Sequence, residues 1–230
     1  GKSWPKVNQR SSFGHHQAVN EDIPALLHEI ISRRGHVPQI WVGHGLGSVL
    51  LCSVYARFGE GLCPVLRVVH FGARRQIIST NTAKTLLLDF VWKRLSAWLV
   101  KINGYLPATF LRMGQANESA ASYRDYLEWS SVDQWLDPED GFDYGEAILQ
   151  QQLPPSFYFA AMGDRVYGDP ADVRKFVKEL GAHDGRMMVL SRRDGNLRDY
   201  NHLEMLQHKD CEEDHFPLLL DWLQQVEVPS

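Results

Sequence analysis

Short apolar runs alternate with amphipathic segments along most of this chain. Runs of β-branched and aromatic residues predict buried strands over residues 39–42, 65–71, 156–162 and 186–190. Apolar residues spaced three and four apart predict helices over residues 21–34, 48–58, 169–180 and 215–225. Residues 1–20 are polar and rich in turn-forming residues, which predicts a loop. This order predicts an α/β fold with a mostly parallel sheet and helices on both faces.

The alternation breaks off between residues 76 and 150. The pattern there predicts a long helix over residues 82–102, with one apolar face made of Leu87, Val91, Leu95, Trp98 and Ile102. A crossover between parallel strands rarely needs ~75 residues, so we interpret residues 76–150 as a helical cap. The cap would be inserted into a core formed by residues 1–75 and 151–230. Its tryptophans either pack as ordinary core or line an apolar substrate pocket; they are Trp92, Trp98, Trp129 and Trp135.

The composition fits one globular domain with an insertion. The chain has 230 residues, of which 44% are hydrophobic and 23% charged. A net charge of −4 and a pI near 6.2 argue against a nucleic-acid partner. No apolar run approaches the ~18 residues of a membrane span. Three cysteines without a CxxC pair fit a reducing compartment, so we expect a cytoplasmic protein.

One glycine-rich turn stands out between a predicted strand and a predicted helix. Gly43-His44-Gly45-Leu46-Gly47 has the layout of a nucleophile elbow, G-x-S-x-G, in which the chain turns sharply from strand to helix. We expect Gly43 and Gly47 to lie where a β-carbon would collide with neighbouring backbone. The central position holds Gly45 where a serine is expected. Glycine adopts the strained turn easily but offers no nucleophile, and loss of such a serine costs a factor of ~10⁶ in turnover.

Other interpretations of this turn are weaker. A dinucleotide-binding loop would show G-x-G-x-x-G, but Ser48 stands where the third glycine belongs, and no acidic residue ends the following strand. Ser48 itself falls in the first turn of the helix, where packing or capping explains it. Cys52 lies one turn further, inside a helix predicted to be buried, so a packed thiol is expected rather than a reactive one.

An acid and a histidine are expected later in the chain, in that order. Asp164 ends the third predicted strand, at the edge of an open α/β sheet where ligands bind. Two rivals have structural explanations, because Asp169 precedes Pro170 as an N-cap and Asp172 falls in the first turn of the same helix. We therefore predict Asp164 as the triad acid.

The predicted base is His202, in Tyr200-Asn201-His202-Leu203-Glu204-Met205 after the fourth strand. His208, Cys211 and His215 are its neighbours along the chain. Their spacing matches no standard zinc pattern, so we predict no metal and no other cofactor.

Together these segments resemble the α/β-hydrolase superfamily over nearly the whole chain. Gly163-Asp164, Gly168-Asp169-Pro170-Ala171-Asp172-Val173 and the His202 segment are similar to those of capped esterases and lipases, including acid lipases. The resemblance implies carboxylic ester hydrolysis by a serine, aspartate and histidine, with the N–H of Leu46 in the oxyanion hole. Gly45 departs from this pattern.

The resemblance also implies strands that would precede Gly1, together with a loop that supplies half of the oxyanion hole. The chain begins with Gly1 rather than Met, so we expect it to be part of a longer protein. Without those strands, the strand containing Ile40 would form an uncovered sheet edge.

Three hypotheses follow for the function. The first is an esterase- or lipase-like hydrolase that Gly45 impairs or inactivates, acting on a small apolar ester. The second is a non-catalytic module that holds an apolar acyl ligand under the cap. The third and weakest is association with a lipid surface through the 82–102 helix, whose polar face has a modest basic bias from Lys84, Lys93, Arg94 and Lys101. The oligomeric state is left open.

Overall fold

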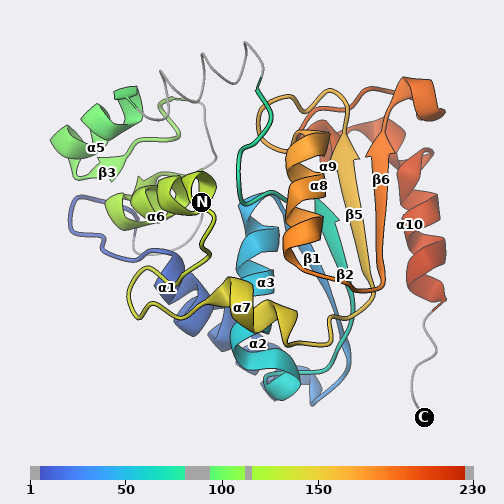
Figure 1. Ribbon diagram of the computed structural model, residues 1–230, viewed down its shortest axis with the longest axis horizontal. Coiled ribbons are helices and arrows are strands. Elements are labelled where there is room, and N and C mark those ends of the chain that lie inside the picture. The colour runs from blue at the N-terminus through green and yellow to red at the C-terminus, as the bar shows by residue number, and fades with distance from the viewer. Residues whose placement is uncertain (1–5, 81–93, 112–115, 226–230) are drawn as a thin grey trace.

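The computed structural model describes residues 6–80, 94–111 and 116–225 (Figure 1). Its main feature is a sheet of four parallel strands in the order β1-β2-β5-β6. The strands are β1 (Gln39–His44), β2 (Val65–Phe71), β5 (Ser156–Ala161) and β6 (Gly185–Leu190). The prediction of a parallel α/β sheet is confirmed, and each strand lies within about two residues of its predicted range.

Helices flank the sheet on both faces, as the sequence predicts. The longer ones are α2 (Ile23–Arg34), α3 (Leu46–Phe58), α6 (Ala120–Ser131), α8 (Pro170–Glu179) and α10 (His215–Gln224). The shorter ones are α1 (His15–Gln17), α5 (Ser96–Asn103), α7 (Tyr144–Leu149) and α9 (Glu204–Gln207). Single turns complete the chain: a π-turn at Ala18–Asp22 and 3₁₀ turns at Gly59–Gly61, Arg192–Asp194 and Lys209–Glu212.

Side chains of the central strands alternate between two cores. On β5, Tyr158 and Ala160 join the cluster that contains α3 and α8, whereas Phe157 and Phe159 join the cluster that contains α10. This alternation follows from the two-residue period of a strand. All six residues of β5 are buried, because the strand has a neighbour on each edge and helices on each face.

Strand β1 lies at the edge of the sheet. Among the described residues it pairs only with β2, and the side chains of Ile40 and Val42 are 44% and 59% exposed. These two residues point away from α3, on the same sheet face as the α10 core. The expected uncovered edge at Ile40 is therefore present in the described part of the chain.

The helical region near the N-terminus begins earlier than predicted. The predicted loop over residues 1–20 is wrong for residues 15–20, where α1 and the π-turn run directly into α2. One reason is tertiary, because Asp125 Oδ2 accepts the His15 N–H at 2.8 Å. A local bond adds to it, in which Gln17 Oε1 accepts the Gly14 N–H at 2.7 Å. A cap from a residue 110 positions away gives no signal in the local sequence.

The long segment between β2 and β5 has two parts. Its first part holds α5, the short hairpin of β3 (Tyr105–Leu106) and β4 (Glu118–Ser119), and α6, which in Figure 1 lie to one side of the sheet. They enclose a small apolar cluster of their own around Leu106, Ala108 and Tyr123. Its second part, including α7, packs on α3 in the main core. The division into a core and a cap stays a prediction.

The tryptophans of this segment differ in their surroundings. Trp129 and Trp135 are buried in the main core, at 3% and 2% exposure, and their rings meet edge to face. Trp98 on α5 is 58% exposed. Residues 82–93 of the predicted long helix, including Trp92, lie outside the described residues. Core packing is thus confirmed for two of the four tryptophans.

No helix within the described residues is both long and apolar enough to span a lipid bilayer.

Candidate functional site

The glycine-rich turn joins the end of β1 to the start of α3. Gly45 stands between them with φ 54° and ψ −123°, a conformation that residues with a β-carbon rarely adopt. Its N–H donates to the Phe71 carbonyl at 2.9 Å, and its own carbonyl accepts the Ser48 N–H at 3.2 Å. These bonds hold the turn against both the neighbouring strand β2 and the first turn of α3.

The two flanking glycines have different reasons to be there. A β-carbon on Gly43 would lie 2.6 Å from Ser48 Cα, so the close strand–helix approach requires glycine at this position. A β-carbon on Gly47 would meet no described atom within 4 Å. The expectation that Gly47 avoids a collision is therefore wrong, because the second residue of α3 faces open space rather than the β1 backbone.

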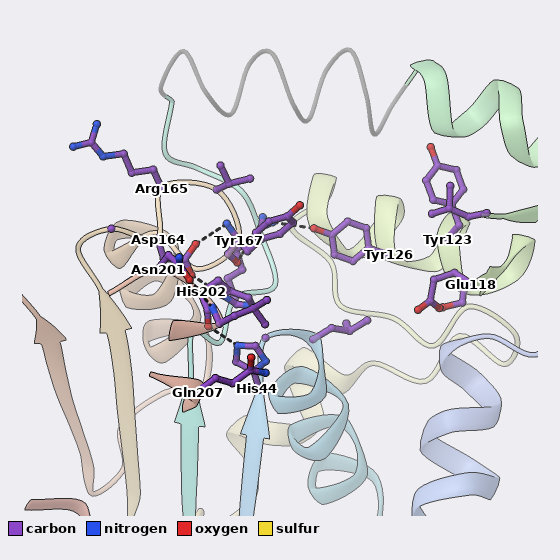
Figure 2. A pocket seen from close by; sticks show the side chains of 18 of the residues that line it. His44, Glu118, Tyr123, Tyr126, Asp164, Arg165, Tyr167, Asn201, His202 and Gln207 are labelled. Carbon is purple, nitrogen blue, oxygen red and sulfur yellow. Dashed lines mark hydrogen bonds and ion pairs between the residues drawn. The ribbon is translucent and has the colours of Figure 1, made fainter. Parts of the chain in front are cut away.

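Asp164 and His202 form a hydrogen-bonded pair beside this turn. His202 Nδ1 lies 2.6 Å from Asp164 Oδ2, and the Tyr167 N–H donates to Asp164 Oδ1 at 2.9 Å (Figure 2). Burial alone would raise the pKa of Asp164, which is 3% exposed. The bonds from His202 and from the backbone N–H groups of Gly168 and Tyr167 outweigh burial and lower that pKa. Asp164 is therefore ionised at neutral pH.

The ionised carboxylate sets the orientation of the His202 ring. A carboxylate only accepts hydrogen bonds, so Nδ1 carries the proton and Nε2 of a neutral ring is left as an acceptor. That Nε2 faces Gly45: a β-carbon built on the glycine would lie 3.1 Å from it. The structure thus brings together the three residues expected at the nucleophile, acid and base positions.

His44 makes a contact that the sequence did not indicate. Its Nε2 donates to the backbone carbonyl of His202 at 2.9 Å, and the two rings lie 4.1 Å apart at 32°. Burial, with the nearby His202, lowers the pKa of His44, so its ring stays neutral and can stack against the second histidine. The Tyr167 ring also lies near the His202 imidazole, with ring centroids 5.5 Å apart. His44 was predicted only as the second residue of the glycine-rich turn.

A cavity of about 1000 Å³ opens over this arrangement (Figure 2). Gly45 and Leu46 line it from the β1–α3 turn, and the loops after β2, β5 and β6 contribute further walls. These loops follow the carboxyl ends of neighbouring parallel strands, where open α/β sheets bind ligands. The opposite wall comes from β3, β4 and α6, with Tyr123 and Tyr126 as its aromatic residues. Among the described residues, tyrosines rather than tryptophans line the cavity.

Leu46, predicted for the oxyanion hole, lies at the start of a helix. It is the first residue of α3 and lines the cavity beside Gly45. The first N–H groups of a helix have no acceptor within the helix, so the Leu46 N–H can donate to a developing negative charge.

The rival residues have structural contacts away from the cavity. Asp169 caps α8 by accepting the Ala171 N–H at 2.9 Å. Asp172 does more than its predicted place in the first turn suggests, since its Oδ1 accepts the N–H groups of Ile78 and Ser79 after β2. Ser48 is fully buried next to Gly43, and burial raises the pKa of Cys52 to about 12.

The three neighbours of His202 along the chain do not converge on one point. His208 lies beside Arg198 and Asp210, whereas His215 Nε2 donates to the Met205 carbonyl. Cys211 Sγ contacts the Glu204 carbonyl. Within the described residues, the one group with metal-ligand spacing is His16, Asp137 and Asp140, outside the cavity. Asp137 there already accepts hydrogen bonds from the Tyr144 hydroxyl and from backbone N–H groups.

Comparison with solved structures identifies the fold. The chain superposes on the protein designated non-heme bromoperoxidase BpoC from Mycobacterium tuberculosis H37Rv with a TM-score of 0.58 and 15% identity, over 96% of this chain and 77% of that one. It superposes on the esterase EaEST from Exiguobacterium antarcticum with a TM-score of 0.54 and 11% identity, over 96% of this chain and 79% of the esterase. The superposition on a monoacylglycerol lipase from Paleococcus ferrophilus has a TM-score of 0.52 and 14% identity, over 93% of this chain and 77% of the lipase. No protein-family model and no curated protein sequence matches the chain.

These likenesses, together with the parallel sheet, show that the chain has the α/β-hydrolase fold. The expected resemblance is confirmed at the level of the fold.

Proposed function

We propose that this protein carries the binding and proton-transfer parts of a carboxylic ester hydrolase, with turnover impaired or absent because Gly45 occupies the nucleophile position. The observation that carries the proposal is the Asp164–His202 pair whose free Nε2 faces Gly45. His202 would act as general base, Asp164 would orient it, and the Leu46 N–H would stabilise an oxyanion. The esterase and the lipase among the structural neighbours support ester chemistry for this fold.

The turn geometry supports a nucleophile elbow. A serine at position 45 would carry its hydroxyl one bond beyond a β-carbon that lies 3.1 Å from His202 Nε2, within hydrogen-bonding reach of that nitrogen. The strained φ and ψ of Gly45 are the kind that place such a side chain outward, toward the cavity. Position 45 thus has the conformation for a nucleophile but lacks its side chain.

The ligand class follows from the cavity. Its walls combine the apolar side chains of Leu46, Leu106 and Val166 with tyrosine rings, and its volume suits a small acyl chain or ester. The apolar part of such a ligand would pack against α6 while the ester carbonyl approaches Leu46. We propose the segment over residues 76–150 as the cap that covers this ligand and the cytoplasm as the compartment.

A non-catalytic binding module is the second candidate. It is favoured by one observation, the absence of any side chain at position 45 beside a cavity of about 1000 Å³. Such a protein would hold an acyl ligand without cleaving it. Saturable binding of hexanoate esters by calorimetry, with no hydrolysis in any variant, would support this second role.

The test of the first proposal is a set of three purified proteins: the chain itself, Gly45→Ser, and Gly45→Ser combined with His202→Ala. Hydrolysis of p-nitrophenyl butyrate and octanoate is measured for each, and circular dichroism checks that each is folded. We expect the chain itself to show no turnover that depends on His202, and Gly45→Ser to exceed the double variant by at least about 10²-fold.

A folded Gly45→Ser protein no faster than the double variant would overturn the triad assignment. Combining Gly45→Ser with Asp164→Asn provides a further control, because loss of the orienting carboxylate should lower kcat by about 10⁴-fold while the ester still binds.

A further inference from the structure

Arg74 is a buried cation that lines the cavity and has no counter-ion among the described residues. Arg74 follows β2 and is 6% exposed, yet no carboxylate of the described residues lies within ion-pairing distance of it. Its Nε donates to the Tyr167 carbonyl and its Nη2 to the Tyr126 hydroxyl at 2.9 Å, and both of these acceptors are neutral. Its Nη1 is buried and has no hydrogen-bond partner in the described part of the chain.

The adjacent arginine shows what the fold provides when an arginine is structural. Arg75 is 4% exposed, and its Nε lies 2.9 Å from Glu179 Oε2. Its remaining N–H groups donate to backbone carbonyls of the 129–134 segment. A buried charge without such compensation is strongly unfavourable. Two consecutive buried arginines therefore differ: Arg75 is paired with Glu179, whereas Arg74, at the cavity, has no carboxylate partner in the described part of the chain.

Arg74 lies close to the Asp164–His202 pair. The backbone of Tyr167 connects the two, since its N–H donates to Asp164 Oδ1 and its carbonyl accepts from Arg74. Gly72, two residues before Arg74, packs against the histidine: a β-carbon built there would lie 2.9 Å from His202 Cε1. A ligand group bound by Arg74 would thus sit in the same cavity as an ester bond presented to position 45.

The other charged groups that line the cavity do not neutralise Arg74. Asp164 is held by His202, as described above. Glu118 accepts the Ser122 hydroxyl at 2.9 Å, and burial raises its pKa. Figure 2 shows Glu118 beside Tyr123, away from the His202 end of the cavity. Arg165 is the other arginine that lines the cavity.

We propose that Arg74 is a specificity residue that binds a carboxylate of the ligand, so that the preferred ligands are acyl compounds with an anionic end, such as monoesters of dicarboxylic acids. The ester part of this inference rests on the proposed function, whereas the binding of an anion by Arg74 does not. One carboxylate supplies one negative charge, which matches one guanidinium that has no counter-ion among the described residues. A doubly charged phosphate would leave excess negative charge next to Asp164.

The test compares monomethyl adipate, which is anionic at neutral pH, with dimethyl adipate, which has the same chain length and is neutral. Both are titrated by calorimetry into the chain itself, Arg74→Gln, Arg74→Lys and the matched control Arg165→Gln. We expect the chain to bind the anion at least about tenfold more tightly, as one hydrogen bond to a charged group warrants. Arg74→Gln should lose this preference and keep its affinity for the neutral ester, whereas Arg165→Gln should retain most of the preference.

Arg74→Lys is the control for misfolding: it keeps the positive charge, so it should keep part of the preference for the anionic ester. Equal affinity of the chain for the two esters, no binding of the monoester, or an unchanged preference in a folded Arg74→Gln would each overturn the proposal. The readout needs no serine and no turnover. An anion preference without hydrolysis in Gly45→Ser would therefore refute only the proposed function, and hydrolysis without an anion preference would refute only the role of Arg74.

Discussion

His202 Nε2 lies 3.1 Å from the point where a β-carbon of residue 45 would be, although residue 45 is a glycine and has none. The histidine is held in this direction from two sides, by Asp164 on its Nδ1 and by His44 on its backbone carbonyl. Its proton-accepting nitrogen thus faces the proposed nucleophile position. We expect a serine side chain at position 45 to raise ester hydrolysis and to lower stability.

Gly45→Ser and Gly45→Ala should both lower the free energy of unfolding by about 1–3 kcal/mol. The reason is the backbone conformation, φ 54° and ψ −123°, which a residue with a β-carbon adopts only under strain. Urea unfolding at pH 7 measures the change. Alanine is the matched control: it should show the same loss of stability as serine and no gain of ester hydrolysis. Equal stability of all three proteins would mean that the turn relaxes and that the strain argument is wrong.

Gly43→Ala and Gly47→Ala should differ although both glycines flank the same turn. A β-carbon at position 43 would lie 2.6 Å from Ser48 Cα, so alanine there should cost about 1–3 kcal/mol or more through overpacking. Position 47 lies within α3 and has open space, so alanine should leave stability unchanged or raise it by up to about 1 kcal/mol through helix propensity. Thermal unfolding of the two variants tests this, and a similar loss in both would contradict it.

His15 should make the protein less stable as the pH falls from 6.5 toward 4. His15 is 2% exposed, and its ring contacts that of Trp129 with centroids 4.5 Å apart and planes tilted by 51°. Neither ring nitrogen has a hydrogen-bond partner within the described residues. Burial lowers its pKa to about 4, with only partial opposition from Asp137. Below pH 6.5 the unfolded chain therefore takes up a proton that the folded chain does not, which favours unfolding.

His15→Phe removes this proton uptake and keeps a ring against Trp129. Urea unfolding at pH 7, 5.5 and 4.5 should show that the variant gains stability relative to the original chain as the pH falls. Burial also lowers the pKa of His44, His70 and His215, but these residues are common to both proteins, so their contributions cancel in the difference. A difference that stays constant across the three pH values would show that His15 is not the group responsible.

Local patterns are enough to predict the strands and most helices. They also predict that an acid and then a histidine follow the glycine-rich turn along the chain. Strand β5 is a continuous apolar run because it is buried on both faces, and α8 begins at Asp169-Pro170, a cap followed by a proline. The approach of Asp164 to His202 follows from parallel strands ending at one edge of the sheet. Such features depend on residues close together in sequence or on the topology of the fold.

The features that escaped prediction depend on distant partners. The early start of the first helical region requires Asp125, and the position of His202 requires a hydrogen bond from His44, 158 residues away in the chain. The difference between Arg74 and Arg75 is of the same kind, because adjacent residues of the same type have identical local signals. Their roles separate only when the tertiary fold places Glu179 beside one and the cavity beside the other.

Because the two arginines have different partners, replacing each should lower the free energy of unfolding by a different amount. Arg75→Met should lower the free energy of unfolding by about 3–5 kcal/mol, because it removes a buried ion pair with Glu179 and the hydrogen bonds to several backbone carbonyls. Arg74→Met should lower the free energy of unfolding clearly less, since it removes two hydrogen bonds to neutral acceptors together with a buried charge for which the described residues offer no counter-ion. Urea unfolding of both variants at pH 7 provides the comparison. Equal losses would indicate that the fold itself neutralises Arg74, and the cavity would then have no need of an anionic ligand.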